Sequence, residues 1–165
     1  MDSSSLLNFV LTGGLDLLLG LSGYSFRIPP RVYVEMEPGR GREAVLQAIE
    51  AERLSVEPLT DDEMAKSEAL QEATAKGSLD PGEAQVVAVA ISRGWKALVD
   101  DKAAQRVLIA QRGEGSWLTT PAIIVEAIKR GCLTVDQADA LRGAMDDQAH
   151  FRMKGFKSFR ELLGK

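Results

Sequence analysis

The sequence contains one cysteine, Cys132, and one histidine, His150, among 165 residues. A single cysteine excludes an internal disulfide and any zinc site built from several thiolates. A nucleophilic site that pairs serine or cysteine with histidine would have to use His150, which lies in a late polar stretch without a nearby motif. Metal chemistry would therefore have to use carboxylates, which suit hard divalent cations such as Mg²⁺ or Mn²⁺.

Long apolar runs are also missing. No run approaches the roughly 20 residues that a membrane helix needs, and the longest candidate, residues 6–21, is interrupted by polar residues and glycines. This segment lacks the basic leader and cleavage site of a signal peptide, so we expect a cytoplasmic protein without membrane attachment. The net charge of −4 argues against a generally basic, nucleic-acid-coating protein. The basic residues after Phe151 could nevertheless meet a phosphate backbone or an acidic partner, or simply be solvated.

What is present fits one α/β domain. The chain is 45% hydrophobic and 27% charged, which is ordinary for a globular protein of this length. Helical spacing of apolar residues alternates with short apolar runs, which predicts a parallel sheet with helices on both faces. A capping-box pattern at Thr60 and Glu63 predicts a helix to about Lys76. We expect a domain over residues 1–150 and a basic, helical C-terminal tail over residues 151–165.

The most informative stretch is 79–101, which predicts a helix, a buried strand and then two carboxylates. Asp80 suits the N-cap of this helix, and Glu83 stands at the third helical position, from which a side chain can reach back to the cap. Asp100 and Asp101 directly follow the apolar run. Because ligands bind at the carboxyl ends of strands in open α/β sheets, this pair of acids indicates a functional site.

Carboxylates stand at four predicted element ends, namely Asp2, Glu35, Glu83, and Asp100 with Asp101. Gathered at one sheet edge, they would repel one another unless a cation neutralised them or a proton were shared. Such a cluster favours one or two Mg²⁺ or Mn²⁺ ions and metal-assisted hydrolysis at phosphorus. Local explanations stand beside this one. Asp2 can be a helix N-cap, Glu35 a solvated side chain, Glu83 half of a capping box, and Asp100 and Asp101 the cap of the next helix.

Four motifs in order resemble the PIN-domain family, which includes the VapC toxins. They are Asp2-Ser3-Ser4 with Leu6; Ile28-Pro29 with Val32 and Glu35; Leu79-Asp80 with Gly82-Glu83-Ala84; and Leu98 with Asp100-Asp101-Lys102 and Arg106. The likeness spans residues 2–144 and is greatest to the subfamily with LDxGEA and DDK motifs. It implies a PIN-like fold, with a short central parallel sheet flanked by helices on both faces. The family's first strand should precede Asp2, where this sequence has only Met1.

The resemblance implies an Mg²⁺- or Mn²⁺-dependent ribonuclease, the toxin of a toxin–antitoxin pair. It makes Asp2, Glu35 and Glu83 metal-site residues, with Asp101 or Asp100 as the fourth and the alignment favouring Asp101. Lys102 and Arg106 would lie near the site and could hold phosphate. A cognate antitoxin and a homodimer are the implied protein partners, and apolar residues in 6–21 and 123–128 would suit a dimer face. The alternatives are a degenerate PIN-fold binding module without nuclease activity and a carboxylate hydrolase of small phosphoesters.

Overall fold

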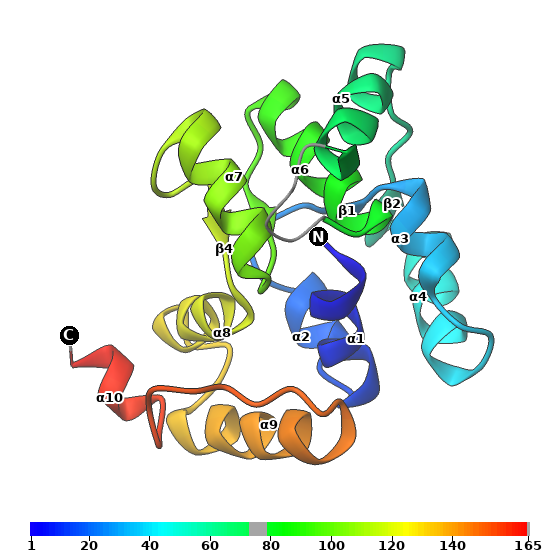
Figure 1. Ribbon diagram of the computed structural model, residues 1–165. Coiled ribbons are helices and arrows are strands. Elements are labelled where there is room, and N and C mark those ends of the chain that lie inside the picture. Colours follow the sequence, from blue (N-terminus) through cyan, green and yellow to red (C-terminus); the bar gives the residue numbers. More distant parts are fainter. Residues whose placement is uncertain (73–78, 165) are drawn as a thin grey trace.

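The computed structural model describes residues 1–72 and 79–164, in which helices alternate with short strands (Figure 1). The elements are α1 (Ser3–Leu11), α2 (Leu15–Leu19), β1 (Phe26–Ile28), α3 (Pro30–Glu35), α4 (Arg40–Glu50), β2 (Leu54–Val56), α5 (Asp61–Glu72), α6 (Pro81–Arg93), β3 (Ala97–Leu98), α7 (Lys102–Arg112), β4 (Trp117–Leu118), α8 (Thr120–Lys129), α9 (Val135–Gln148) and α10 (Arg160–Leu163). This order confirms the predicted α/β class. The predicted end of α5 near Lys76 lies outside the described residues.

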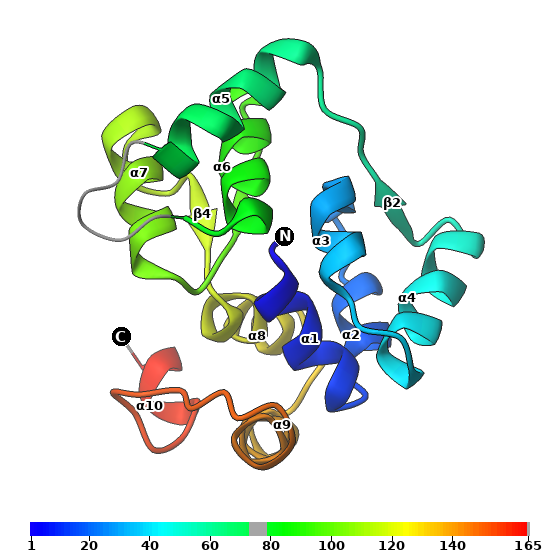
Figure 2. The same cartoon turned by 45° about the vertical axis from the view of Figure 1, so that its right-hand side comes forward.

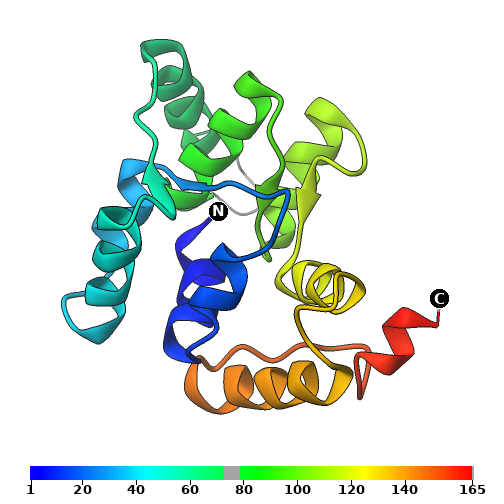
Figure 3. The same cartoon turned by 180° about the vertical axis from the view of Figure 1, so that it is seen from behind.

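The strands form two separate parallel pairs, β1 with β2 and β3 with β4. The parallel direction agrees with the prediction, whereas the division into two pairs was not expected. The N-terminus lies between the pairs, as the view from behind shows (Figure 3). The Met1 ammonium donates a hydrogen bond to the Arg27 carbonyl of β1 at 3.0 Å. The Asp2 amide donates to the Leu98 carbonyl of β3 at 3.2 Å, so these two residues bridge the pairs.

Helix α6 supplies much of the core and lies beside α5 (Figure 2). Its buried residues are Gly82, Ala84, Val86, Val87, Ala88, Val89 and Ala90. Each of the buried valines contributes roughly 1.5–3 kcal/mol relative to an exposed position. The helix begins in the predicted capping box and ends at Gly94, whose φ of 71° is a left-handed conformation that glycine adopts without strain. Its first turn, which carries Glu83, is therefore held at a fixed place beside the core.

The C-terminal segment runs back along α9 (Figure 1). Met153 and Phe159 are buried in the core. Asp139 of α9 accepts hydrogen bonds from the Ser158 hydroxyl at 2.6 Å and the Phe159 amide at 2.8 Å. These contacts attach the segment to the rest of the molecule, and the division at residue 150 stays a prediction. Among the described helices, none has the length and apolar character needed to cross a membrane.

Candidate functional site

Asp2 is the most deeply buried of the candidate acids, with 1% of its surface exposed. It caps α1, because its Oδ1 atom accepts a hydrogen bond from the Ser5 amide at 2.9 Å. The Oδ2 atom is buried and has no hydrogen-bond partner within residues 1–72 and 79–164. Burial raises the pKa of Asp2 to about 6, although the bonds from Ser5 act in the opposite direction. A buried carboxylate oxygen without a donor is available as a ligand for a cation.

Asp100 lies next to Asp2, and Ser5 connects the two. The Ser5 hydroxyl donates to Asp100 Oδ2 at 3.1 Å, while the Ser5 amide donates to Asp2. Thr120 also binds Asp100, through its amide to Oδ1 at 2.8 Å and its hydroxyl to Oδ2 at 2.5 Å. The Asp100 carboxylate is thus fixed between α1 and α8. Burial raises its pKa above the usual range.

Glu83 forms the predicted capping box with Asp80. The Glu83 amide donates to Asp80 Oδ1 at 2.8 Å, and the Asp80 amide donates to Glu83 Oε2 at 3.3 Å. Burial and then the charge of Asp80 raise the pKa of Glu83 to about 7, with smaller contributions from Asp101 and Asp2. Glu83 therefore lies within electrostatic reach of two other candidate acids, which stand 18 and 81 positions away in the sequence.

Asp101 is exposed and caps α7, as its local interpretation predicted. Its Oδ1 atom accepts hydrogen bonds from the Ala103 amide at 2.6 Å and the Ala104 amide at 3.0 Å. The neighbouring Gln105 donates its side-chain amide to the carbonyls of Val99 and Asp100, each at 3.2 Å. Gln105 was not identified from the sequence. It fixes the backbone that joins β3 to α7, and so it orients both aspartates.

Glu35 approaches the same region from the end of α3. Its Oε2 atom accepts a hydrogen bond from the Ser3 hydroxyl at 2.9 Å, and Arg31 Nε binds Oε1 at 3.2 Å. A Cβ atom at Gly82 would collide with Glu35 Oε2. The glycine before Glu83 therefore allows the Glu35 carboxylate to lie against the first turn of α6. The solvated interpretation of Glu35 does not account for these contacts.

The candidate acids share one region without forming a closed coordination shell. Within the part of the chain that the structure describes, no three histidine, cysteine, aspartate or glutamate side chains converge closely enough to hold a metal ion. The reason is local, since Glu83 and Asp101 bind helix N-termini and Glu35 and Asp100 bind hydroxyl groups. The chemistry of the donors nevertheless fits Mg²⁺ or Mn²⁺, because all are carboxylates and no group among the described residues donates a hydrogen bond to Asp2 Oδ2.

Lys102 and Arg106 lie on the exposed face of α7, one helical turn apart. Lys102 directly follows Asp101, the N-cap of α7, so both cations belong to the first two turns of the helix that starts at the candidate site. Exposed cations beside an acidic site can bind the phosphates of a polyanion. The role of Lys102 and Arg106 in binding phosphate stays a prediction.

Comparison with known proteins identifies the family. A family model described as PIN domain matches residues 1–162, nearly the whole chain. No curated protein and no solved structure matches. PIN domains are typically nucleases that act on RNA and use divalent metal ions. The match confirms the resemblance at the level of the family, and the α/β fold of the chain agrees with it. This chain belongs to the PIN-domain family.

Proposed function

We propose that the protein is an Mg²⁺- or Mn²⁺-dependent ribonuclease that hydrolyses RNA phosphodiesters. The observation that carries the proposal is the buried Asp2 Oδ2 atom without a hydrogen-bond partner in the described residues. Asp100 is connected to Asp2 through Ser5, and Glu83 lies within electrostatic reach. A fold that concentrates buried negative charge in this way gains stability when a cation binds there.

Each acid has a distinct place in the proposed site. Asp2, Glu83, Asp100 and Asp101 would hold the metal, and Glu35 would complete the acidic wall beside Glu83. When bound, the metal supplies activation of a water and stabilisation of the attacking and leaving oxygens. Without metal the pKa of Glu83 is raised to about 7, and a bound cation would favour the ionised, metal-binding form of this carboxyl group.

The basic side chains of α7 would position the RNA. Lys102 and Arg106 would contact backbone phosphates on one side of the acids, which places the scissile phosphodiester at the carboxylates. Such contacts carry no sequence preference by themselves and weaken as salt is raised.

We further propose that the protein acts in the cytoplasm as a VapC-like toxin, with a homodimeric form and a cognate antitoxin protein. Apolar side chains remain exposed on three neighbouring helices, Leu11 on α1, Val34 on α3 and Leu46 on α4. Val34 has 62% of its surface exposed. A protein partner would cover such residues. Ile123 and Ile124 are buried in the core, so they do not supply the dimer face that the sequence suggested.

The second candidate function is a PIN-fold binding module without nuclease activity. It is favoured by the capping roles of Asp2, Glu83 and Asp101, which give each acid a structural purpose. The two candidates differ in metal binding. A module whose acids only cap helices is not stabilised by millimolar Mn²⁺ in a thermal melt, whereas the nuclease is.

The nuclease is tested by cleavage of a labelled RNA in Mn²⁺ and in EDTA. We expect Glu83→Gln and Asp101→Asn to abolish cleavage with unfolding midpoints close to that of the parent, because glutamine and asparagine retain the capping bonds. Asp136→Asn, which removes one exposed charge from the first turn of α9, is the matched control and should cleave normally. Parent-like cleavage by Glu83→Gln in Mn²⁺ would remove this residue from the site.

A further inference from the structure

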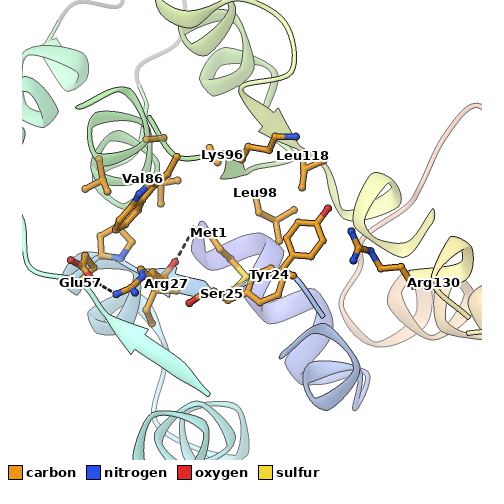
Figure 4. A pocket seen from close by; sticks show the side chains of 18 residues that line it. Met1, Tyr24, Ser25, Arg27, Glu57, Val86, Lys96, Leu98, Leu118 and Arg130 are labelled. Atoms are coloured by element: carbon orange, nitrogen blue, oxygen red, sulfur yellow. Dashed lines mark hydrogen bonds and ion pairs between the residues drawn. The ribbon is translucent and has the colours of Figure 1, made fainter. Parts of the chain in front are cut away.

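The cavity between the two strand pairs is separate from the candidate acids (Figure 4). Its volume is 610 Å³, and its walls include β1, β3 and Val86, Val89 and Ala90 of α6. None of the candidate acids lines this cavity, and neither do Lys102 and Arg106. A substrate that reaches the acids therefore passes outside the cavity, and the charges that guide it belong to the helices around the acids.

Arg31 places a positive charge beside the acids on α3. It stands in the first turn of this helix, and its Nε atom donates a hydrogen bond to Glu35 Oε1 at 3.2 Å. The Glu35 carboxylate in turn lies against Gly82, in the first turn of α6. Asp101, the N-cap of α7, lies within electrostatic reach of Glu83 in that same turn. Helices α3 and α7 both contact α6, and they lie on opposite sides of it (Figures 1 and 3).

Helix stability does not account for the ion pair of Arg31 and Glu35. The cation precedes the anion by four positions, which is the weaker order of such a pair, and it stands at the helix end where the dipole disfavours positive charge. Glu126 and Arg130 of α8 have the favourable order, with the cation at the C-terminal end. Exposed pairs contribute little in either order, and 47% of the Arg31 side chain is exposed. The ion pair is therefore weak, and it leaves Arg31 able to bind another anion.

The backbone of Arg31 is fixed, although its side chain is exposed. The Arg31 amide donates to Gln85 Oε1 at 3.1 Å, which joins the start of α3 to the helix that carries Glu83. Among the described residues, the guanidinium makes one hydrogen bond, that of Nε to Glu35. Its Nη1 and Nη2 groups carry the remaining N–H donors, which can bind a phosphate through parallel bonds. The guanidinium thus stands beside the acids with donors available for an anion.

We propose that Arg31 is a substrate-binding residue that contacts an RNA phosphate on the α3 side of the acids, opposite the phosphates bound by Lys102 and Arg106. The RNA backbone then crosses the first turn of α6, with the acids between its points of attachment. Clustered carboxylates repel a polyanion, so cations on both sides hold the RNA there more firmly than cations on one side. Arg31 keeps its bond to Glu35 and uses its Nη groups for the phosphate. The inference rests on the proposed ribonuclease function, which it extends to the path of the substrate.

The test measures binding of a fluorescent single-stranded RNA to the full chain in EDTA, at several salt concentrations. We expect Arg31→Gln to weaken the affinity by about tenfold at low salt. The slope of log affinity against log salt should fall in magnitude by about 0.7, because one phosphate contact is lost. Arg31→Lys keeps the charge without the planar fork, so it should recover the slope and part of the affinity. Arg53→Gln, which removes an exposed arginine paired with Asp16 of α2, is the matched control and should bind like the parent. Equal affinities of Arg31→Gln and Arg53→Gln would overturn the proposal.

Glu35→Gln separates phosphate binding by Arg31 from a structural role in holding Glu35. If Arg31 acted only by fixing Glu35, Glu35→Gln would lower the RNA affinity as Arg31→Gln does, and that result would contradict the proposal. We expect instead that Glu35→Gln binds RNA at least as tightly as the parent, because a negative charge is removed and Arg31 stays. The unfolding midpoint of Arg31→Gln should lie close to that of the parent, since its ion pair is exposed.

Cleavage of the same RNA in Mn²⁺ distinguishes this inference from the proposed function. We expect Arg31→Gln to raise KM by at least about tenfold, because it removes a contact made already in the bound substrate. A parent that cleaves, together with an unchanged KM in Arg31→Gln, would reject the role of Arg31 and leave the nuclease in place. RNA binding that depends on Arg31 in a chain that does not cleave would support the role and reject the nuclease. A parent that binds no RNA would overturn both.

Discussion

The carboxylate of Glu35 lies directly against Gly82, in the first turn of the helix that carries Glu83. A Cβ atom at Gly82 would collide with Glu35 Oε2 and lie 3.0 Å from Oε1. The bonds from Ser3 and Arg31 hold Glu35 in that position. Glycine at this place therefore lets two acids from α3 and α6 approach each other.

Gly82→Ala should reduce RNA cleavage by about tenfold or more while changing stability by less than about 1 kcal/mol. The alanine methyl group displaces the Glu35 carboxylate from its bonds to Ser3 and Arg31. Alanine has a higher helix propensity than glycine, which offsets the loss of these bonds in the free energy of unfolding. Cleavage rates and urea unfolding measure the two effects separately. Gly143→Ala is the matched control, because a Cβ there meets open space, and it should be stabilising with normal cleavage. Full activity of Gly82→Ala would mean that the position of Glu35 is unimportant for the reaction.

Thr120→Val removes the hydroxyl that binds Asp100 Oδ2 and keeps the shape of a fully buried side chain. We expect a loss of about 1–3 kcal/mol in unfolding free energy, because a buried carboxylate loses a donor. Mn²⁺ affinity should fall as well, since Asp100 is no longer fixed. Thr12→Val, at a hydroxyl that donates to backbone carbonyls of α1, should leave Mn²⁺ affinity unchanged. Equal Mn²⁺ affinities of parent and Thr120→Val would exclude this orienting role.

Stability without metal should fall as pH rises from about 4 to 6. The pKa of Asp2 is raised to about 6 and that of Glu83 to about 7, so the folded state binds more protons than the unfolded state in this window. The contribution of these two carboxyl groups to the free energy of unfolding is complete below their pKa values in the unfolded state. It is lost as pH rises through their pKa values in the folded state. For the buried Asp2 the loss is on the order of 2 kcal/mol. The pKa of the Met1 amine is lowered from 8.0 to about 6, so above pH 6 this group makes the free energy of unfolding rise with pH.

Unfolding midpoints between pH 4.5 and 6 measure this effect. Glu63 does not interfere, because Arg93 lowers its pKa to about 2 and its stabilisation is lost only as pH falls below about 4.5. The double variant Asp2→Asn, Glu83→Gln should show a flatter profile than the parent, and saturating Mn²⁺ should remove the fall because a cation favours the ionised carboxylates. Parallel profiles of parent and double variant would contradict the assigned cause.

Local signals in the sequence were sufficient to predict most helices and strands and the helix caps formed by the candidate acids. The capping box at Asp80 and Glu83 and the left-handed end at Gly94 form as predicted, because each depends only on residues within one helix. The capping of α1 by Asp2 and of α7 by Asp101 is likewise local. These caps do not remove the acids from the candidate site, since Asp2 still keeps one oxygen without a partner in the described chain.

The contacts that arrange the acids were beyond prediction because they join distant parts of the chain. Ser5 and Asp100 are 95 residues apart, and Ser3 and Glu35 are 32 apart. Thr120 precedes Pro121 and resembles a helix cap, yet Thr119 is the cap of α8 and Thr120 binds Asp100. Periodicity predicted parallel strands correctly, but it could not reveal that they form two pairs with a cavity between them.

The central claim is that Asp2 and its neighbours bind a divalent cation, and calorimetric titration of Mn²⁺ at pH 7.5 into the parent and Asp2→Asn tests it most directly. Asparagine keeps the α1 cap, so loss of folding does not confuse the comparison. We predict saturable binding by the parent and by Asp136→Asn, and affinity at least about tenfold weaker in Asp2→Asn. Equal Mn²⁺ affinity in the parent and Asp2→Asn, or no binding by either, would contradict the account.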